Sequence, residues 1–163
     1  MIEIKNIYKK FGKLEVLNNI NLSFKKGECI ALIGPNGCGK TTLIKSILGM
    51  VIPTKGDIWF DEKSILKEFK YREKIGYMPQ IGRYPDYMTV GQIIEMIKQI
   101  RKSEHILDED LIKAFELEKI VDKQMRTLSG GTTQKVSATL AFLFNPDVLI
   151  LDEPTAGLDP LAS

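Results

Sequence analysis

The residues of this chain best suited to chemistry are the nine from Gly34 to Thr42, which read GPNGCGKTT. They lie between an apolar run and a segment with helical spacing, which is the setting that a phosphate-binding loop requires. Glycines let backbone amides turn toward a phosphate, and the start of the next helix adds a positive dipole end. Lys40 is expected to bridge the β- and γ-phosphates of a nucleotide, and the Thr41 hydroxyl to ligate Mg²⁺. The residues predicted to line the loop are Gly34, Pro35, Asn36, Gly37, Cys38, Gly39, Lys40, Thr41 and Thr42.

Two acidic residues, Asp152 and Glu153, follow the apolar run Val148–Leu151. A strand there would deliver both carboxylates to its carboxyl end, where open α/β sheets bind ligands. Asp152 suits the second shell of Mg²⁺, and Glu153 suits a residue that orients or deprotonates water, a role worth about 10²–10⁴ in rate. The alternative is a pair of acidic residues that end a strand at the surface, which becomes minor with a phosphate loop upstream.

A third motif, LSGG, covers Leu128–Gly131. Ser129, Gly130 and Gly131 are expected to open a helix, where amides and a hydroxyl together can bind an anion. The alternative interpretation is an ordinary serine N-cap, which is common.

In this order and spacing, the three motifs closely resemble the nucleotide-binding domain of ATP-binding cassette (ABC) proteins, over the whole chain. The resemblance identifies GPNGCGKT, Gly34–Thr41, as the Walker A loop, LSGG as the signature and VLILDE as the Walker B strand. It also identifies Ala156–Asp159 as the D-loop. By this resemblance the cofactors are ATP and Mg²⁺.

The resemblance adds two residues outside these motifs. Gln80 matches the Q-loop glutamine, which contacts Mg²⁺ and senses the transport partner, and Phe11 falls where the family stacks an aromatic ring on adenine. Packing is the alternative role for Phe11. The implied catalytic set is Glu153, Lys40 and Gln80, and the implied metal set is Thr41, Gln80 and Asp152.

The family pairs head to tail, so the resemblance implies a dimer of two nucleotide-binding domains with two ATP molecules at its seam. Ser129 and Gly131 of one subunit would cover the γ-phosphate that the other binds. A transmembrane permease is the second implied partner, which places the protein in the cytoplasm, on the inner face of the cell membrane. Tyr84, Tyr87 and Met88 either help to receive a helix of that permease or form an ordinary packed loop.

Three features depart from the family pattern. Thr132 stands where the family usually has glutamine after LSGG. Cys38 fills a loop position that is often small, either by simple size tolerance or as a thiol activated by the helix start. The chain also stops at Ser163 without the family's switch histidine, since its only histidine is His105. We therefore expect these 163 residues to be a truncated domain that binds Mg-ATP and hydrolyses it poorly.

The elements that must position these residues follow from local patterns. Alternating apolar residues predict antiparallel strands near Ile2–Lys5 and Ile20–Phe24, and the continuous apolar run Cys29–Ile33 predicts a strand buried on both faces. Further strands are expected at Asp57–Phe60, at Lys74–Met78 and, fully buried, at Val148–Leu151. Helices are expected over Lys40–Gly49, Thr89–Ile97, Asp108–Leu117 and Ser129–Asn145. The second of these begins with capping-box spacing at Thr89.

Together these elements predict an α/β fold: a phosphate-loop NTPase (RecA-like) core with an N-terminal antiparallel β subdomain and an inserted helical subdomain. We expect residues 1–163 to form one ABC ATPase domain, incomplete at its C-terminus. Residues 82–126 would form the helical insert, which carries the signature (128–131) at its end.

Composition narrows the classes of function. The chain is 44% hydrophobic with a formal net charge of +2, and it has no charged tail that would indicate a nucleic-acid partner. The main alternative to a transporter ATPase is a soluble ABC ATPase that acts on ribosomes, whose tandem cassettes a chain ending at Ser163 does not exclude. A third class is a nucleotide-gated binding module without turnover.

Overall fold

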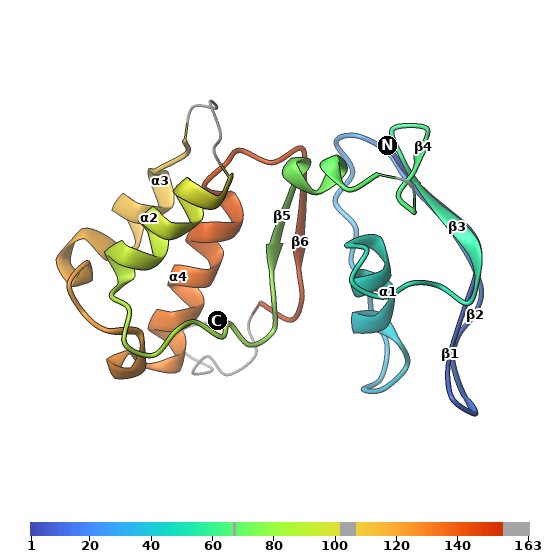
Figure 1. Cartoon of the computed structure of the whole chain (residues 1–163), viewed down its shortest axis with the longest axis horizontal. Coiled ribbons are helices and arrows are strands. Elements are labelled where there is room, and N and C mark those ends of the chain that lie inside the picture. The colour runs from blue at the N-terminus through green and yellow to red at the C-terminus, as the bar shows by residue number, and fades with distance from the viewer. Residues whose placement is uncertain (67, 102–106, 155–163) are drawn as a thin grey trace. The chain divides into compact units, whose positions relative to one another are not determined.

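The computed structural model describes residues 1–66, 68–101 and 107–154. The chain divides into two compact units, Met1–Arg72 and Glu73–Ser163, and each is described here by itself. Figure 1 labels their helices and strands. Among the described residues, no helix combines the length and the apolarity needed to cross a membrane.

The first unit is built on a four-stranded antiparallel sheet with the order β2-β1-β3-β4. Its strands are β1 (Ile2–Phe11), β2 (Leu14–Phe24), β3 (Lys55–Phe60) and β4 (Lys63–Ser64). Ile2 and Ile4 are buried while Glu3 and Lys5 are exposed, because successive side chains of a strand point to opposite faces. The predicted antiparallel strands are thus confirmed, and both are longer than expected.

Helix α1 (Lys40–Ile47) follows the glycine-rich loop and begins at the predicted residue. Its buried face includes Leu43, Ile44 and Ile47. The helix ends at Gly49, whose φ of 66° lies in the left-handed region that glycine adopts without steric cost. The Gly49 amide donates to the Ser46 carbonyl at 3.0 Å, which closes the last turn as predicted.

The strand predicted at Cys29–Ile33 is wrong. The segment belongs to neither sheet of the described chain, and Ile33 is 90% exposed. Apolar composition shows only that burial would be favourable, whereas a strand is stabilised by cross-strand hydrogen bonds. Because these residues pair with no described strand, the apolar run alone does not make one.

The second unit contains the parallel pair β5 (Ile75–Met78) and β6 (Val148–Leu151), in the register Ile75↔Val148 to Met78↔Leu151. The strand predicted before Pro79 is therefore confirmed. Full burial of β6 is contradicted, since its first three residues are half-buried and Leu151 is 40% exposed. In the described chain β6 pairs with one strand only, and a parallel strand is buried on both faces only where other elements cover it.

The second unit also contains helices. They are α2 (Val90–Arg101), α3 (Asp110–Ala114) and α4 (Gly130–Phe142), with short 3₁₀ turns η1 (Lys70–Lys74, which begins in the first unit), η2 (Leu117–Ile120) and η3 (Met125–Thr127). Their common core is Val90, Ile93, Leu117, Met125 and Val136. The boundaries 82–126 of the helical insert stay a prediction.

Two details test the helix predictions. The Thr89 amide donates to Gln92 Oε1 at 2.9 Å, and the Gln92 amide donates to Thr89 Oγ1 at 3.2 Å. This reciprocal pair is the predicted capping box. In contrast, the helix predicted over Asp108–Leu117 is shorter, because Glu116 has a φ of 53° and a left-handed residue does not continue an α-helix.

Candidate functional site

The glycine-rich loop has the backbone that a phosphate cradle requires. Gly37 and Gly39 have φ angles of 80° and 99°, a region that residues with a Cβ rarely adopt. A Cβ on Gly39 would also lie 2.8 Å from the Val16 carbonyl oxygen of β2. Glycine is therefore required at Gly39 for both its conformation and its close approach to the sheet.

Lys40 is the first residue of α1, and its side chain folds back over the loop. Its Nζ donates hydrogen bonds to the carbonyl oxygens of Gly34 at 2.8 Å and Pro35 at 3.0 Å. The ammonium group is thus held against the loop that the sequence predicts to bind phosphates. Thr41 and Thr42 follow in the first turn of the helix, whose start carries about half a positive charge.

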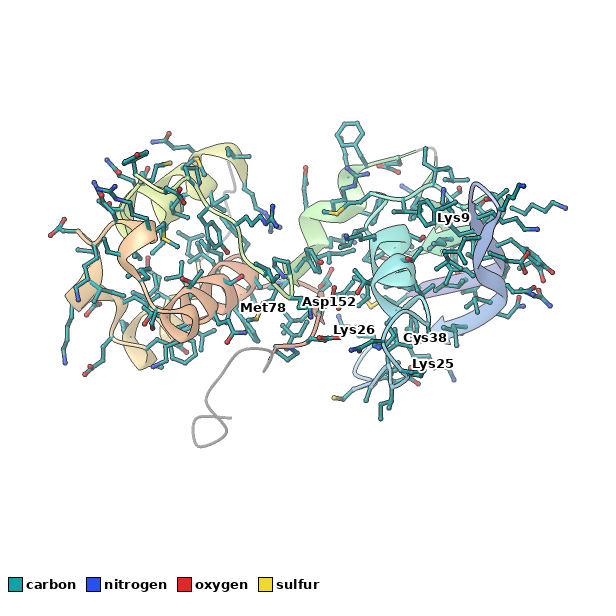
Figure 2. The ribbon with its side chains drawn as sticks, turned by 90° about the horizontal axis from the view of Figure 1, so that it is seen from below. Lys9, Lys25, Lys26, Cys38, Met78 and Asp152 are labelled. Atoms are coloured by element: carbon teal, nitrogen blue, oxygen red, sulfur yellow. The ribbon has the colours of Figure 1, made fainter. Side chains whose placement is uncertain are left out.

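Cys38 lies on the same loop and is exposed (labelled in Figure 2). A Cβ on Gly34 would lie 2.8 Å from its Sγ, so the thiol packs closely over Gly34. A side chain at Gly34 would require the thiol to move. It leaves both interpretations of Cys38, size tolerance and an activated thiol, open. Pro35 and Asn36 are exposed and complete the loop.

In the second unit, Asp152 follows β6 directly and is only 4% exposed. Its amide donates to the Met78 carbonyl at 2.9 Å, which extends the pairing of β6 with β5 by one residue (both residues are labelled in Figure 2). Its carboxylate accepts a hydrogen bond from the Tyr77 hydroxyl. The pKa of Tyr77 is raised, mainly by burial and to a smaller extent by the negative charge of Asp152. The sequence analysis missed Tyr77, because only the parallel register of β5 and β6 places it beside Asp152.

Glu153 lies beside Gln80, although 73 positions separate them in the sequence. Gln80 Nε2 donates to Glu153 Oε2 at 2.6 Å. Glu153 has a φ of 51°, which is uncommon for a residue with a Cβ and often marks a functional position. The structure therefore brings together the two residues expected to act on water and the metal. It does not test their catalytic roles.

Ser129 is the N-cap of α4, as predicted. Its Oγ accepts a hydrogen bond from the Thr132 amide at 3.3 Å, and its hydroxyl lies 2.9 Å from Thr132 Oγ1. Thr132, the residue that departs from the family pattern, is therefore a capping partner of Ser129. Gly130 and Gly131 form the first turn of the helix. Binding of an anion at this helix start stays a prediction.

Phe11 ends β1 opposite Leu14, and it is 49% exposed. Phe11 as a whole residue is thus about half accessible to solvent. The predicted D-loop, Ala156–Asp159, and His105 lie outside the described residues.

The loop after Gln80 is mostly packed. Tyr84 is half-buried and its hydroxyl donates a hydrogen bond to Ser137 Oγ of α4 at 3.0 Å, while Met88 packs against the helical core. Burial raises the pKa of Tyr84, and the bond to Ser137 opposes this effect. Tyr87 alone of the three predicted contact residues is strongly exposed, at 73%.

The same loop borders a cavity of about 340 Å³, which is lined by Gly82, Arg83, Tyr84, Asp86, Met125 and Thr133.

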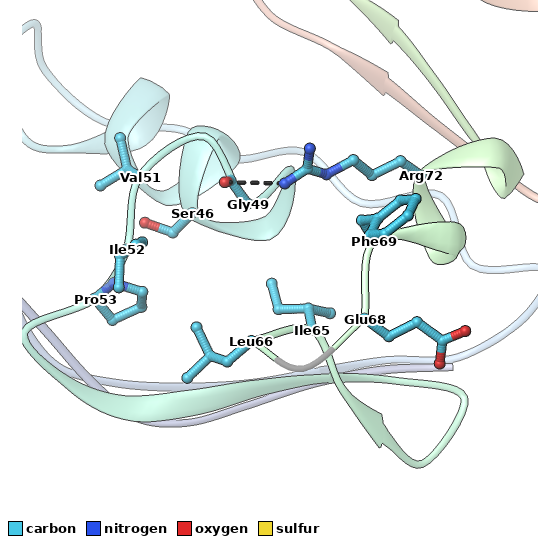
Figure 3. A pocket seen from close by; sticks show the side chains of 10 residues that line it. All are labelled: Ser46, Gly49, Val51, Ile52, Pro53, Ile65, Leu66, Glu68, Phe69 and Arg72. Atoms are coloured by element: carbon cyan, nitrogen blue, oxygen red, sulfur yellow. Dashed lines mark hydrogen bonds between the residues drawn. The ribbon is translucent and has the colours of Figure 1, made fainter. Parts of the chain in front are cut away.

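The first unit holds a cavity of about 280 Å³ that the sequence analysis did not anticipate (Figure 3). It lies beyond the end of α1, and its lining includes Val51, Ile52, Pro53, Ile65 and Leu66. Arg72 Nη2 donates to the Gly49 carbonyl at 3.1 Å beside it. No predicted site residue lines this cavity.

Comparison with known proteins gives one consistent result. The sequence model of a family described as "ABC transporter" matches residues 17–156. The zinc import ATP-binding protein ZnuC of Rickettsia conorii is 39% identical over 161 residues, which are 98% of this chain and 64% of that protein. The Nod factor export ATP-binding protein I of Burkholderia lata is 35% identical over 169 residues, 99% of this chain and 55% of that protein. The chain thus spans less than two thirds of the length of these relatives.

Solved structures indicate the same family as the sequence comparisons. An ATP-binding subunit of an ABC transporter superposes with a TM-score of 0.87 at 31% identity, over 99% of this chain and 69% of that one. A dimeric ATP-binding cassette in a post-hydrolysis state, bound to ADP and Pi, gives 0.85 at 29% identity, over 99% of this chain and 78% of that one. The predicted fold class, a phosphate-loop NTPase core with an antiparallel β subdomain and helices, is confirmed.

Proposed function

The chain belongs to the ABC transporter family, as its ATP-binding domain, and from that premise we propose that it binds ATP with Mg²⁺ and hydrolyses it to drive a separate membrane permease. The observation that carries this proposal is the loop Gly34–Gly39, whose glycine conformations and following helix start form a cradle with Lys40 at its edge. A polyphosphate would draw Lys40 Nζ away from the Gly34 and Pro35 carbonyls, since phosphate oxygens are charged acceptors and carbonyl oxygens are not.

The donor set fits a bound magnesium nucleotide. Thr41 supplies a hydroxyl, Gln80 an amide oxygen and Asp152 a carboxylate, and Mg²⁺ prefers such oxygen ligands together with phosphates and water. Mg²⁺, when bound, would neutralise part of the charge that develops on the phosphates. Glu153 would orient the attacking water and accept its proton, with Gln80 holding that carboxylate in place.

The proposed partners are a second nucleotide-binding domain and a transmembrane permease. The dimeric cassette that resembles this chain supports the first, and the names of the ABC transporter relatives support the second. Ser129, Gly130 and Gly131 at the start of α4 would then face the nucleotide bound by the other domain in a head-to-tail dimer. The protein would act in the cytoplasm at the inner face of the membrane. Similar proteins are named for import and for export, so we propose no direction and no cargo.

Calorimetric titration of the purified chain with Mg-ATP tests the proposal. We expect binding in the range that enzymes show for their substrates, about 1 μM to 1 mM. Lys40→Ala should weaken it by at least roughly tenfold, because charged hydrogen bonds contribute about 1.5–3 kcal/mol each. Lys45→Ala, which removes the same charge from an exposed position on the same helix, is the matched control and should bind like the parent.

Two outcomes contradict the proposal: no binding at millimolar Mg-ATP, or equal binding by the Lys40→Ala variant. Slow turnover by these 163 residues is a separate expectation. Release of inorganic phosphate by the purified chain measures it.

A further inference from the structure

We propose that Lys9 is a positioning residue that orients Phe11 to stack on the nucleobase. The inference rests on the proposed function, because it assigns a residue to the same nucleotide site. It starts from a cluster at the end of β1 that no motif of the sequence singles out: Lys9, Phe11 and the backbone of Ile52.

Lys9 makes two contacts with its ammonium group. Its Nζ donates to the Ile52 carbonyl at 2.7 Å and lies 4.8 Å from the centroid of the Phe11 ring. Lys9 and Phe11 are two positions apart on one strand, so their side chains leave the same face of the sheet. A cation within about 6 Å of a ring centroid is attracted by the negative face of the ring. Lys9 therefore holds one face of Phe11.

The other face is left for a ligand. Because Phe11 is 49% exposed and Lys9 lies over one side of its ring, a flat partner would approach from the opposite side. Stacking of a base on an aromatic side chain is sequence-tolerant and depends on the accessible face of the ring. A cation behind the ring draws electron density away from the free face, which lowers its repulsion of the electron-rich face of adenine.

The contact with Ile52 also fixes where the ring stands. Ile52 lies in the segment between α1 and β3, and the same segment bonds the end of β1 twice more. The Thr54 amide donates to the Tyr8 carbonyl at 2.7 Å, and the Lys10 amide donates to Thr54 Oγ1 at 3.1 Å. Lys9 therefore ties the ring to the segment that follows α1, the helix that begins with Lys40. Holding the ring in place before a nucleotide arrives lowers the cost of ordering it on binding.

The test compares two ligands, Mg-ATP and Mg-tripolyphosphate, the second of which lacks a base. Lys9→Met keeps the aliphatic stem and removes the charge. We expect it to weaken Mg-ATP binding about threefold to tenfold, the effect of a cation–π contact and one hydrogen bond. Binding of Mg-tripolyphosphate should not change. Lys13→Met makes the same charge change on the exposed turn of this hairpin and should leave both affinities unchanged.

Two further variants make the test specific. In a Phe11→Ala background, Lys9→Met should cause no additional loss of ATP affinity, because the ring on which Lys9 acts is absent. Lys9→Arg should retain most of the affinity, since a guanidinium group also lies over aromatic rings. Thermal unfolding of each variant identifies any loss of fold.

The outcomes are separable. If the parent chain binds Mg-ATP and Lys9→Met binds it equally well, the inference is overturned and the proposed function stands. The same holds if Lys9→Met weakens ATP and tripolyphosphate alike, or if its effect persists in the Phe11→Ala background. If the parent chain binds neither ligand, the proposed function itself has failed.

Discussion

At the scale of single residues, the contact between Gln80 and Glu153 is the one that bears most directly on the proposed turnover. A 2.6 Å hydrogen bond from Gln80 restrains one carboxylate oxygen of Glu153, whose backbone has a φ of 51°. Replacement of the carboxylate by an amide keeps the size of the side chain and removes the proton acceptor. We expect Glu153→Gln to bind Mg-ATP as the parent does.

The same variant should release phosphate about 10²–10⁴ times more slowly, the usual contribution of a positioned general base. Single-turnover assays of the purified protein with Mg-ATP provide the measurement. Asp147→Asn, an acidic residue just before β6 that pairs with Lys74 at 3.9 Å, is the control and should keep its rate. Equal rates for Glu153→Gln and the parent would exclude Glu153 as the base.

A second residue-scale prediction concerns alkaline pH. The pKa of the Tyr84 hydroxyl is raised in the folded chain, mainly by burial, so the folded state holds this proton more tightly than the unfolded state. The resulting stability is fully present below the ordinary tyrosine pKa of about 10 and is lost as pH rises through the folded value.

The free energy of unfolding of the parent, minus that of Tyr84→Phe, should therefore decrease as the pH rises above the ordinary tyrosine pKa of about 10. Urea denaturation at a series of pH values measures this difference in free energy. Tyr87→Phe, at an exposed position, is the control for the effect of removing any tyrosine hydroxyl. A difference that grows with pH would have the wrong sign for a buried tyrosine and would contradict the assignment.

At the scale of elements, helix starts were the features most accurately predicted. Thr89 and Ser129 precede predicted helices, and the side chain of each accepts a hydrogen bond from the amide three residues ahead. Both predicted caps are thus present in the structure. Such signals are local, so a single sequence contains them. The strand at Cys29–Ile33 was predicted wrongly because a strand depends on partners far away in the sequence.

The same argument explains what was missed in the site. Tyr77 contacts Asp152 only because of the register of the parallel strands β5 and β6. Lys9 contacts Ile52, which is 43 positions away in the sequence. Neither contact leaves a local pattern. The loop from Gly34 to Thr42 was found because its residues are consecutive, and Gly37 and Gly39 occupy backbone conformations that favour glycine.

The capping box of α2 gives the prediction at this scale. Thr89→Ala removes the hydroxyl that accepts from the Gln92 amide, and it should lower the free energy of unfolding by about 1 kcal/mol. Gln99→Ala, at an exposed position near the other end of α2, is the control and should change stability by less than about 0.5 kcal/mol. Equal losses in both variants would show that the cap contributes nothing beyond ordinary helix propensity.

At the scale of the whole molecule, the predicted nucleotide ligands are distributed over two compact units. The phosphate loop belongs to Met1–Arg72, whereas Gln80, Asp152 and the signature belong to Glu73–Ser163. Two probes follow these units separately. The single tryptophan, Trp59, lies in β3 of the first unit, and most of the helical ellipticity comes from α2 and α4 of the second.

If one nucleotide engages ligands from both units, Mg-ATP should stabilise both. At a concentration of about 100 times Kd, linkage adds about 2.7 kcal/mol to the free energy of unfolding, which for a chain of this size raises the thermal midpoint by roughly 5–10 °C. We expect the Trp59 fluorescence and the helical ellipticity both to shift, and neither to shift in Lys40→Ala. A shift of the Trp59 signal alone would mean that the nucleotide is held by the phosphate loop without the carboxylates. The chain would then bind ATP with no group in place to activate water, and these 163 residues would act as a binding module and not as an ATPase.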